Sequence, residues 1–100
     1  MIHHMVMWRF ADSAEGKARK ENMAIVRERL LALPAIIPEI KAMKVGCQVL
    51  ADDAYDLVLL SDFEDADALQ TYRVHPAHVA VADYVKLVTT ERRAIDVAYE

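Results

Sequence analysis

The sequence contains only one cysteine, two glycines and three prolines among its 100 residues. The single thiol of Cys47 cannot form an internal disulfide, so cross-links do not hold the fold together. A chain without a disulfide framework is typical of a reducing compartment. The first residues also lack a basic stretch followed by an apolar one, the pattern of a signal peptide. We therefore expect a cytoplasmic protein.

Long apolar runs, basic clusters and glycine-rich loops are missing as well. No apolar run reaches the ~18 residues of a membrane-spanning helix. The 12 Lys and Arg residues are scattered and the formal net charge is −4, which argues against a nucleic-acid-binding surface. Gly16 and Gly46 are too far apart for a phosphate-binding loop, and the four histidines follow no established metal-ligand spacing. We expect no membrane, nucleic-acid or metal partner and no cofactor.

Apolar residues make up 55% of the chain, which exceeds the ~45–50% of ordinary globular proteins. A domain of this length has one small core, so a partner subunit is needed to cover the remaining apolar surface. We therefore predict a single domain over residues 1–100 that assembles as a homodimer.

Hydrophobic periodicity predicts the order of strands and helices. The predicted elements are strand 2–10, helix 14–33, strands 41–50 and 55–63, helices 65–73 and 76–87, and strand 89–99. Asp12 and Glu15 are predicted to cap the first helix, and Pro34 to end it. The apolar segment 34–40 is expected to pack as a short turn.

This β-α-β-β-α-β order predicts a ferredoxin-like α+β fold, in which helices cover one face of an antiparallel sheet. The strands are apolar on both faces, so the face without helices must also be buried. Two such sheets packed across a two-fold axis, or closed into a dimeric α+β barrel, would bury it. We predict that Val45 faces the partner subunit, that His3 does so too, and that Cys47 is a small packed residue.

The most informative stretch of the sequence runs from Tyr72 to His78 and contains the motif Tyr-x-x-His-Pro-x-His. Pro76 suits the first turn of a helix, where a missing N–H costs nothing. Tyr72 and His78 can then point toward the same side of the sheet, which is suitable for a small acid/base pocket. The alternative is structural: both side chains are hydrogen-bonded within the core, and His75 caps the new helix.

Two further polar residues lie within predicted strands. His4 is either a pocket residue or a buried neutral histidine that is hydrogen-bonded to Tyr72 or Asp96. An aspartate in the middle of a strand is unusual. Asp96 therefore either faces solvent at a sheet edge or orients a histidine.

Taken together, these residues resemble the stress-responsive dimeric α/β-barrel (Dabb) family over essentially the whole chain. The residues that carry the resemblance are His4, Ile37-Pro38, Gly46, Tyr55-Asp56, Phe63, Tyr72, His75-Pro76-Ala77-His78 and Asp96. The resemblance implies a dimeric α+β barrel of ferredoxin-like protomers. It also implies that main-chain oxygens of the 34–40 turn can hold a hard cation.

Within this family, the chain resembles polyketide cyclases of the olivetolic acid cyclase type. These enzymes close a linear poly-β-keto thioester by an aldol reaction without a metal or organic cofactor. By motif position, the resemblance implies His78 as the general base and Tyr72 as the donor to the substrate carbonyl. It implies His4 as a pocket histidine and Asp96 as the acidic partner near the base.

The predicted pocket lining differs from that of these cyclases. They carry a further tyrosine on the first helix, whereas residues 27–30 of this chain contain none. We expect an apolar lining for the substrate, formed by Trp8, Leu30, Leu69 and Val81.

Three classes of function are compatible with these features. The first is a cofactor-independent cyclase, lyase or isomerase that acts on a carbonyl-rich small molecule. The second is a non-catalytic, stress-related dimer that binds an apolar ligand or serves a structural role. The third is a cofactor-free oxygenase, which rests on analogy of fold alone. A His78 ring that reaches an open cavity favours the enzyme, whereas a ring sealed by its neighbours favours the second class.

Overall fold

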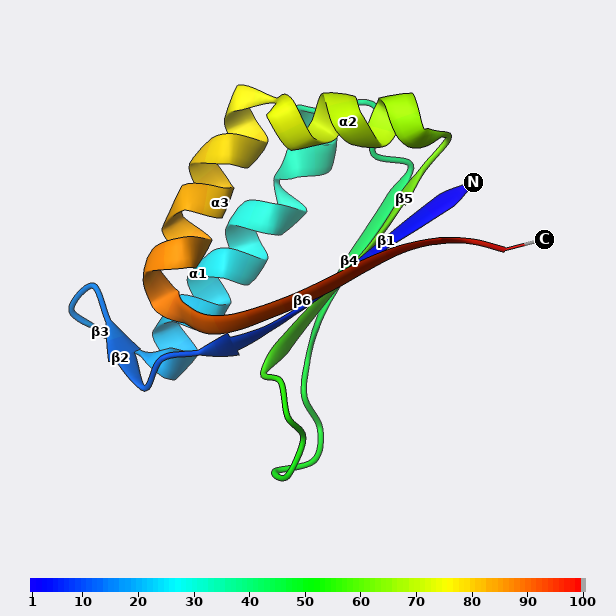
Figure 1. Cartoon of the computed structure of the whole chain (residues 1–100). Helices are drawn as coiled ribbons and strands as arrows, with labels where there is room; N and C mark the ends of the chain where they lie inside the picture. The colour runs from blue at the N-terminus through cyan, green and yellow to red at the C-terminus, as the bar shows by residue number, and fades with distance from the viewer. Residues whose placement is uncertain (100) are drawn as a thin grey trace.

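Four antiparallel strands form the main sheet, and helices cover one of its faces (Figure 1). The computed structural model describes residues 1–99. The strands are, in spatial order, β4 (Ala42–Cys47), β5 (Leu57–Phe63), β1 (Ile2–Phe10) and β6 (Thr89–Ala98). The covering helices are α1 (Arg19–Leu31), α2 (Ala66–Val74) and α3 (Pro76–Val88). This arrangement confirms the ferredoxin-like α+β fold that the periodicity predicts.

Strand β1 lies in the middle of the sheet, with β5 on one side and β6 on the other. Its side chains alternate between the two faces, as in any β-strand. His4, Val6 and Trp8 are buried on the helix-covered face, whereas Met7 on the other face is exposed. The hydrophobic core therefore lies between the sheet and the helices, and His4 is part of its floor.

The face opposite the helices is apolar and exposed in the protomer. Leu60 and Ile95 are the cross-strand neighbours of Met5, and they are 41% and 58% exposed. His3 extends from the same face, and its Nδ1 atom lies 2.6 Å from Oδ1 of Asp62. A contiguous apolar surface of this kind is typical of a protein–protein interface. The bare face of the sheet thus has the character of a subunit contact.

Val45 lies on the helix-covered face, so its predicted position facing the partner is wrong. Its Cα pairs with that of Leu59, and both side chains are buried in the core. Lys44 and Gly46 therefore lie on the bare face of β4. The prediction failed because apolar residues occur at both parities in these strands, which leaves the face undetermined. Cys47, at the end of β4, is exposed rather than packed.

Residues 13–18 form a small hairpin rather than the first turns of a helix. Strand β2 (Ser13–Ala14) pairs with β3 (Lys17–Ala18). The two residues between them, Glu15 and Gly16, have φ angles of 53° and 74°. Positive φ at both central positions is the geometry of a tight two-residue hairpin turn, and glycine adopts it without strain.

The predicted start of the first helix at residue 14, capped by Asp12 and Glu15, is therefore wrong. Helix α1 begins at Arg19. The side chain of Glu21 accepts a hydrogen bond of 3.3 Å from the N–H of Ala18, while Asp12 forms an ion pair with Arg19. The cap is thus supplied from inside the first turn of α1.

The segment after α1 packs as predicted. A single 3₁₀ turn, η1 (Leu33–Ala35), follows the helix, and Ile37 and Ile40 are buried in the core. Strands β4 and β5 are shorter than predicted because residues 48–56 form the loop between them, in which Val49 is 92% exposed.

Asp65 caps the N-terminus of helix α2. The carboxylate of Asp65 accepts a hydrogen bond of 2.8 Å from the N–H of Ala68. This bond satisfies one of the free N–H groups at the start of the helix. No helix within residues 1–99 has both the length and the apolar character that crossing a membrane requires.

Candidate active site

The break between α2 and α3 positions the side chains of the Tyr-x-x-His-Pro-x-His motif. His75 has an extended backbone conformation between the two helices, and Pro76 occupies the first position of α3. Nδ1 of His75 accepts a hydrogen bond of 3.0 Å from the N–H of Ala77. The predicted capping role of His75 is therefore confirmed, and His78 follows within the first turn of α3.

Tyr72 and His78 are in ring contact across this break. Their ring centroids are 4.3 Å apart, and the ring planes are inclined by 41°. Tyr72 is almost completely buried, and its ring also packs against Phe63 at 5.0 Å between centroids. The phenol is therefore held in place by β5 on one side and by the His78 imidazole on the other.

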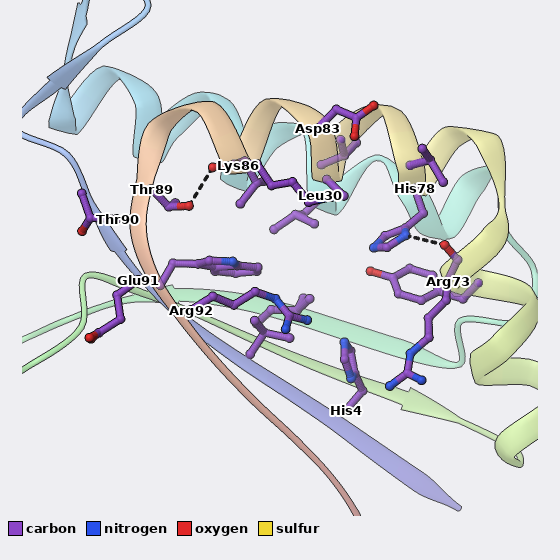
Figure 2. Close-up of a pocket in the computed structure, with 18 residues that line it drawn as sticks. His4, Leu30, Arg73, His78, Asp83, Lys86, Thr89, Thr90, Glu91 and Arg92 are labelled. Atoms are coloured by element: carbon purple, nitrogen blue, oxygen red, sulfur yellow. Dashed lines mark hydrogen bonds between the residues drawn. The ribbon is translucent and has the colours of Figure 1, made fainter.

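The hydrogen bond of His78 fixes which ring nitrogen can act as a base. Nδ1 lies 3.0 Å from the carbonyl oxygen of Arg73. A carbonyl oxygen only accepts hydrogen bonds, so Nδ1 carries the proton and, in the neutral ring, Nε2 carries a lone pair. Figure 2 shows this second nitrogen on the cavity side of the ring. Burial lowers the pKa of His78 below 6.5, so the ring is neutral at pH 7.

His4 has a similar arrangement on the opposite side of the cavity. Its Nδ1 lies 2.5 Å from Oδ1 of Asp96, which is its cross-strand neighbour on β6. The other carboxylate oxygen of Asp96 accepts a hydrogen bond of 2.8 Å from the Arg73 guanidinium. Burial lowers the pKa of His4, and the Asp96 carboxylate opposes that shift. Asp96 is therefore hydrogen-bonded to His4. The resemblance instead places Asp96 near the base, His78.

The hydroxyl of Tyr72 is a buried donor that has no hydrogen-bond partner within residues 1–99. Burial raises the pKa of Tyr72 to about 12, so the phenol stays protonated at neutral pH. An unpaired buried polar group costs about 1–3 kcal/mol, which is why such groups are rare and often functional. The Tyr72 hydroxyl is thus a donor, unsatisfied within residues 1–99, at the wall of the cavity.

These groups border a cavity of about 530 Å³ between α3 and the sheet (Figure 2). The cavity contains His4, Tyr72 and His78 in its wall. Its volume lies within the ~300–1,000 Å³ of small-molecule sites. The His78 ring is only partly buried and faces this open space, rather than being sealed by its neighbours.

Three of the four side chains predicted to line the pocket do so: Trp8, Leu30 and Val81. Leu69 does not line it, because α2 directs this side chain into the core, where it is buried. The basic residues of the wall, Arg73, Lys86 and Arg92, were not predicted. Arg92 has the same parity in its strand as Asp96, so the alternation already places both on one face. Scattered cations are usually solvated, so nothing in the sequence indicated these basic residues in the cavity wall.

No three His, Cys, Asp or Glu side chains within residues 1–99 form a group that could hold a metal ion. The arrangement around the cavity is instead one of proton-transfer groups. It combines two neutral imidazoles, each with a free Nε2, and one protonated phenol.

Residues 2–99 match the family model of the stress responsive A/B barrel domain, Dabb. The chain belongs to this family. A search of curated proteins gives no match to this Dabb domain.

Solved structures with the same fold include two dimeric bacterial proteins of unknown function. The one from Bacteroides fragilis has a TM-score of 0.89 at 26% identity and covers 98% of the Dabb domain and 95% of its own chain. The one from Thermobifida fusca has a TM-score of 0.84 at 28% identity, and the match covers 98% of the Dabb domain and 90% of the Thermobifida fusca chain. The hydroxynitrile lyase of Passiflora edulis shares the fold with a TM-score of 0.85 at 14% identity. The match covers 99% of the Dabb domain and 93% of the lyase chain.

Proposed function

We propose that this Dabb domain is a cofactor-independent enzyme that performs acid/base chemistry on a carbonyl-rich small molecule. The observation that carries the proposal is the pairing of His78 with Tyr72 in one cavity. A neutral imidazole with a free Nε2 lies in ring contact with a buried phenol that lacks a partner within residues 1–99. The first is a base and the second a hydrogen-bond donor, as proton abstraction next to a carbonyl requires.

In the proposed reaction, His78 Nε2 removes a proton from the carbon between two carbonyl groups. The resulting enolate carbon attacks another carbonyl carbon of the same molecule, and a C–C bond forms. The alkoxide that develops accepts a hydrogen bond from the Tyr72 hydroxyl and then takes the proton from the His78 imidazolium. The step is an aldol ring closure in which protons and electrons balance within the protein and substrate.

His4 and Asp96 have a positioning role in this proposal. The 2.5 Å hydrogen bond to Asp96 holds the His4 ring in one orientation with Nε2 free. A neutral His4 across the cavity from His78 can accept a hydrogen bond from an enolised substrate. It therefore selects the substrate orientation in which a carbonyl faces Tyr72.

The aldol cyclisation is the same type of reaction as that of polyketide cyclases of the olivetolic acid cyclase type. Lyase and isomerase reactions that begin by removal of a proton from a carbon next to a carbonyl share its first step. The apolar wall formed by Trp8, Leu30 and Val81 suits a substrate with an alkyl or aryl portion.

The proposal includes a cytoplasmic homodimer in which the bare face of the sheet is the subunit contact. Leu60 and Ile95 expose apolar surface there. The Bacteroides fragilis and Thermobifida fusca proteins, which share the fold, are dimeric.

Proton exchange in D₂O, followed by ¹H NMR, tests the function directly. Carbonyl compounds with exchangeable α-protons, including poly-β-keto esters and lactones, are incubated with wild type, His78→Ala and Tyr72→Phe. We expect wild type to accelerate the loss of the α-proton signal above the buffer rate, and His78→Ala not to do so. Thermal shifts with the same compounds identify which of them bind.

Two results contradict this function. Equal exchange rates in wild type and His78→Ala show that His78 is not the base. Ligand-dependent thermal shifts without any accelerated exchange across the panel favour a non-catalytic binding dimer instead.

A further inference from the structure

The charged side chains around the cavity are not equivalent. Arg73 is paired with Asp96 at 2.8 Å. Figure 2 shows the carboxylates of Asp83 and Glu91 directed away from the middle of the cavity. The guanidinium of Arg92, by contrast, extends toward the middle, near His4 (Figure 2). Lys86 on α3 is a further cation of the lining, and among residues 1–99 neither Lys86 nor Arg92 has an ion-pair partner. Arg92 therefore contributes an unpaired positive charge on the sheet side of the cavity.

Arg92 is fixed in this position by the register of the sheet. Its Cα pairs with that of Trp8 across β1 and β6, on the helix-covered face. Burial is the main cause of the shifted pKa values of His4, Tyr72 and His78, and the Arg92 charge adds a smaller effect that lowers the pKa of each. The described part of the chain offers the Arg92 guanidinium no carboxylate partner within ion-pair distance. The Arg92 guanidinium and the acid/base groups His4, Tyr72 and His78 thus face the same cavity.

Two buried donors accompany Arg92. The Tyr72 hydroxyl and the Trp8 Nε1–H both lack an acceptor among residues 1–99, and both residues line the cavity. An indole N–H can only donate, and a phenol with a raised pKa stays protonated. A ligand that satisfies these groups must therefore bring acceptor oxygens, and the guanidinium favours a negative charge on them.

We propose that the ligand of this site is a carboxylic acid whose carboxylate binds Arg92 while its keto group faces Tyr72 and His78. This assignment rests on the proposed function and narrows its substrate class to keto acids. One guanidinium fork matches one planar carboxylate through two parallel hydrogen bonds.

Matched acid and ester probes test this proposal. The probes are 4-oxo-4-phenylbutanoate and its methyl ester, which share the aryl ketone and differ in the negative charge. Binding to wild type, Arg92→Met and Arg93→Met is measured by titration calorimetry. Arg93→Met is the control because it removes the same charge from the next residue of β6, which lies on the bare face.

We expect wild type to bind the acid at least about tenfold more tightly than the ester, as a hydrogen bond to a charged group predicts. Arg92→Met should lose this preference without weaker binding of the ester, and Arg93→Met should retain it. The assignment is rejected if wild type binds both probes equally, if it does not bind the acid, or if Arg92→Met keeps the preference.

Exchange of the C3 protons of the same probes into D₂O separates this assignment from the proposed function. Exchange of acid and ester at similar rates in wild type and Arg92→Met supports the function and rejects the carboxylate contact. Arg92-dependent binding of the acid without exchange supports the contact and rejects the acid/base function.

Discussion

The carboxylate of Asp96 accepts a 2.5 Å hydrogen bond from Nδ1 of His4, and the two residues are separated by 92 positions in the chain. This contact and the charge of Asp96 raise the pKa of His4 against the effect of burial. Asp96→Asn should therefore lower the pKa of His4 further, because the nearby Arg73 then loses its counter-ion. A ¹H NMR titration of the His4 ring protons measures this, and an unchanged or higher pKa contradicts the assignment.

Replacement of His78 tests its role as the base. We expect His78→Ala to fold and dimerise normally but to lose about 10²- to 10⁴-fold in the rate of α-proton exchange. The matched control is His75→Ala, which removes the helix cap and costs about 1 kcal/mol of stability. That control should retain exchange activity, because His75 does not line the cavity. Loss of folding in His78→Ala, seen by circular dichroism, indicates a structural histidine instead.

Tyr72→Phe separates the hydroxyl from the ring that packs against Phe63. The hydroxyl has no partner within the described chain, so its removal should leave the free energy of unfolding unchanged or slightly increased. The rate of the carbonyl reaction should fall about 10²- to 10³-fold, as expected for the loss of an oxyanion donor. Urea denaturation measures the free energy of unfolding, and exchange kinetics on the same preparation measure the reaction rate. A large loss of stability shows that the hydroxyl has a structural partner.

The stability of the fold should depend on pH through His4 and His78. Burial holds the pKa of both below the ordinary value of 6.5. The unfolded chain therefore binds protons more readily, so folded-state stability is fully present above pH 6.5. It is lost as the pH falls from there through the lowered folded-state pKa values.

Urea midpoints between about pH 8 and about pH 5 reveal this dependence. His78→Asn should show a shallower loss of stability than wild type, because one of the two titrating rings is gone. Equal slopes in the two proteins contradict the shift assigned to His78.

A charge on the bare face of the sheet should dissociate the dimer. Leu60 is partly exposed in the protomer and pairs with Met5 at the centre of this face. We expect Leu60→Glu to be monomeric by light scattering. Leu87→Glu is the control, since Leu87 is 60% exposed on α3 rather than on the sheet. A dimeric Leu60→Glu rejects the bare face as the subunit contact.

The order of strands and helices could be predicted because apolar segments of strand and helix length alternate with turn signals in this sequence. The hairpin at Glu15 and Gly16 was missed because Asp12 and Glu15 also fit a helix cap, and the two readings compete for the same residues. The face of Val45 was assigned wrongly because neighbouring strands are apolar at both parities. That ambiguity arises because the bare face of the sheet is apolar as well as the helix-covered one.

The candidate site was predictable where a local motif defines it. The His-Pro break brings Tyr72 and His78 together through bonds within one short segment. The His4–Asp96 contact depends on the register of β1 and β6, which the sequence could only offer as one of several alternatives. The direction of Leu69 could not be predicted, because it depends on how α2 lies against the rest of the fold. The face of Arg92 was predictable from its strand parity, but a scattered cation is usually expected to be solvated.

The central position of β1 has a consequence for synthesis of the chain. β1 precedes every other element of this domain in the chain, but one of its two sheet neighbours, β6, follows all of them. A nascent chain that has emerged only through α3 already contains His4, Tyr72 and His78 but lacks Asp96 and Arg92. Its core is exposed along one edge of β1, where an edge strand can pair with another chain. Until β6 is present, His4 therefore lacks the Asp96 carboxylate that orients it, and β1 is an edge strand of the sheet.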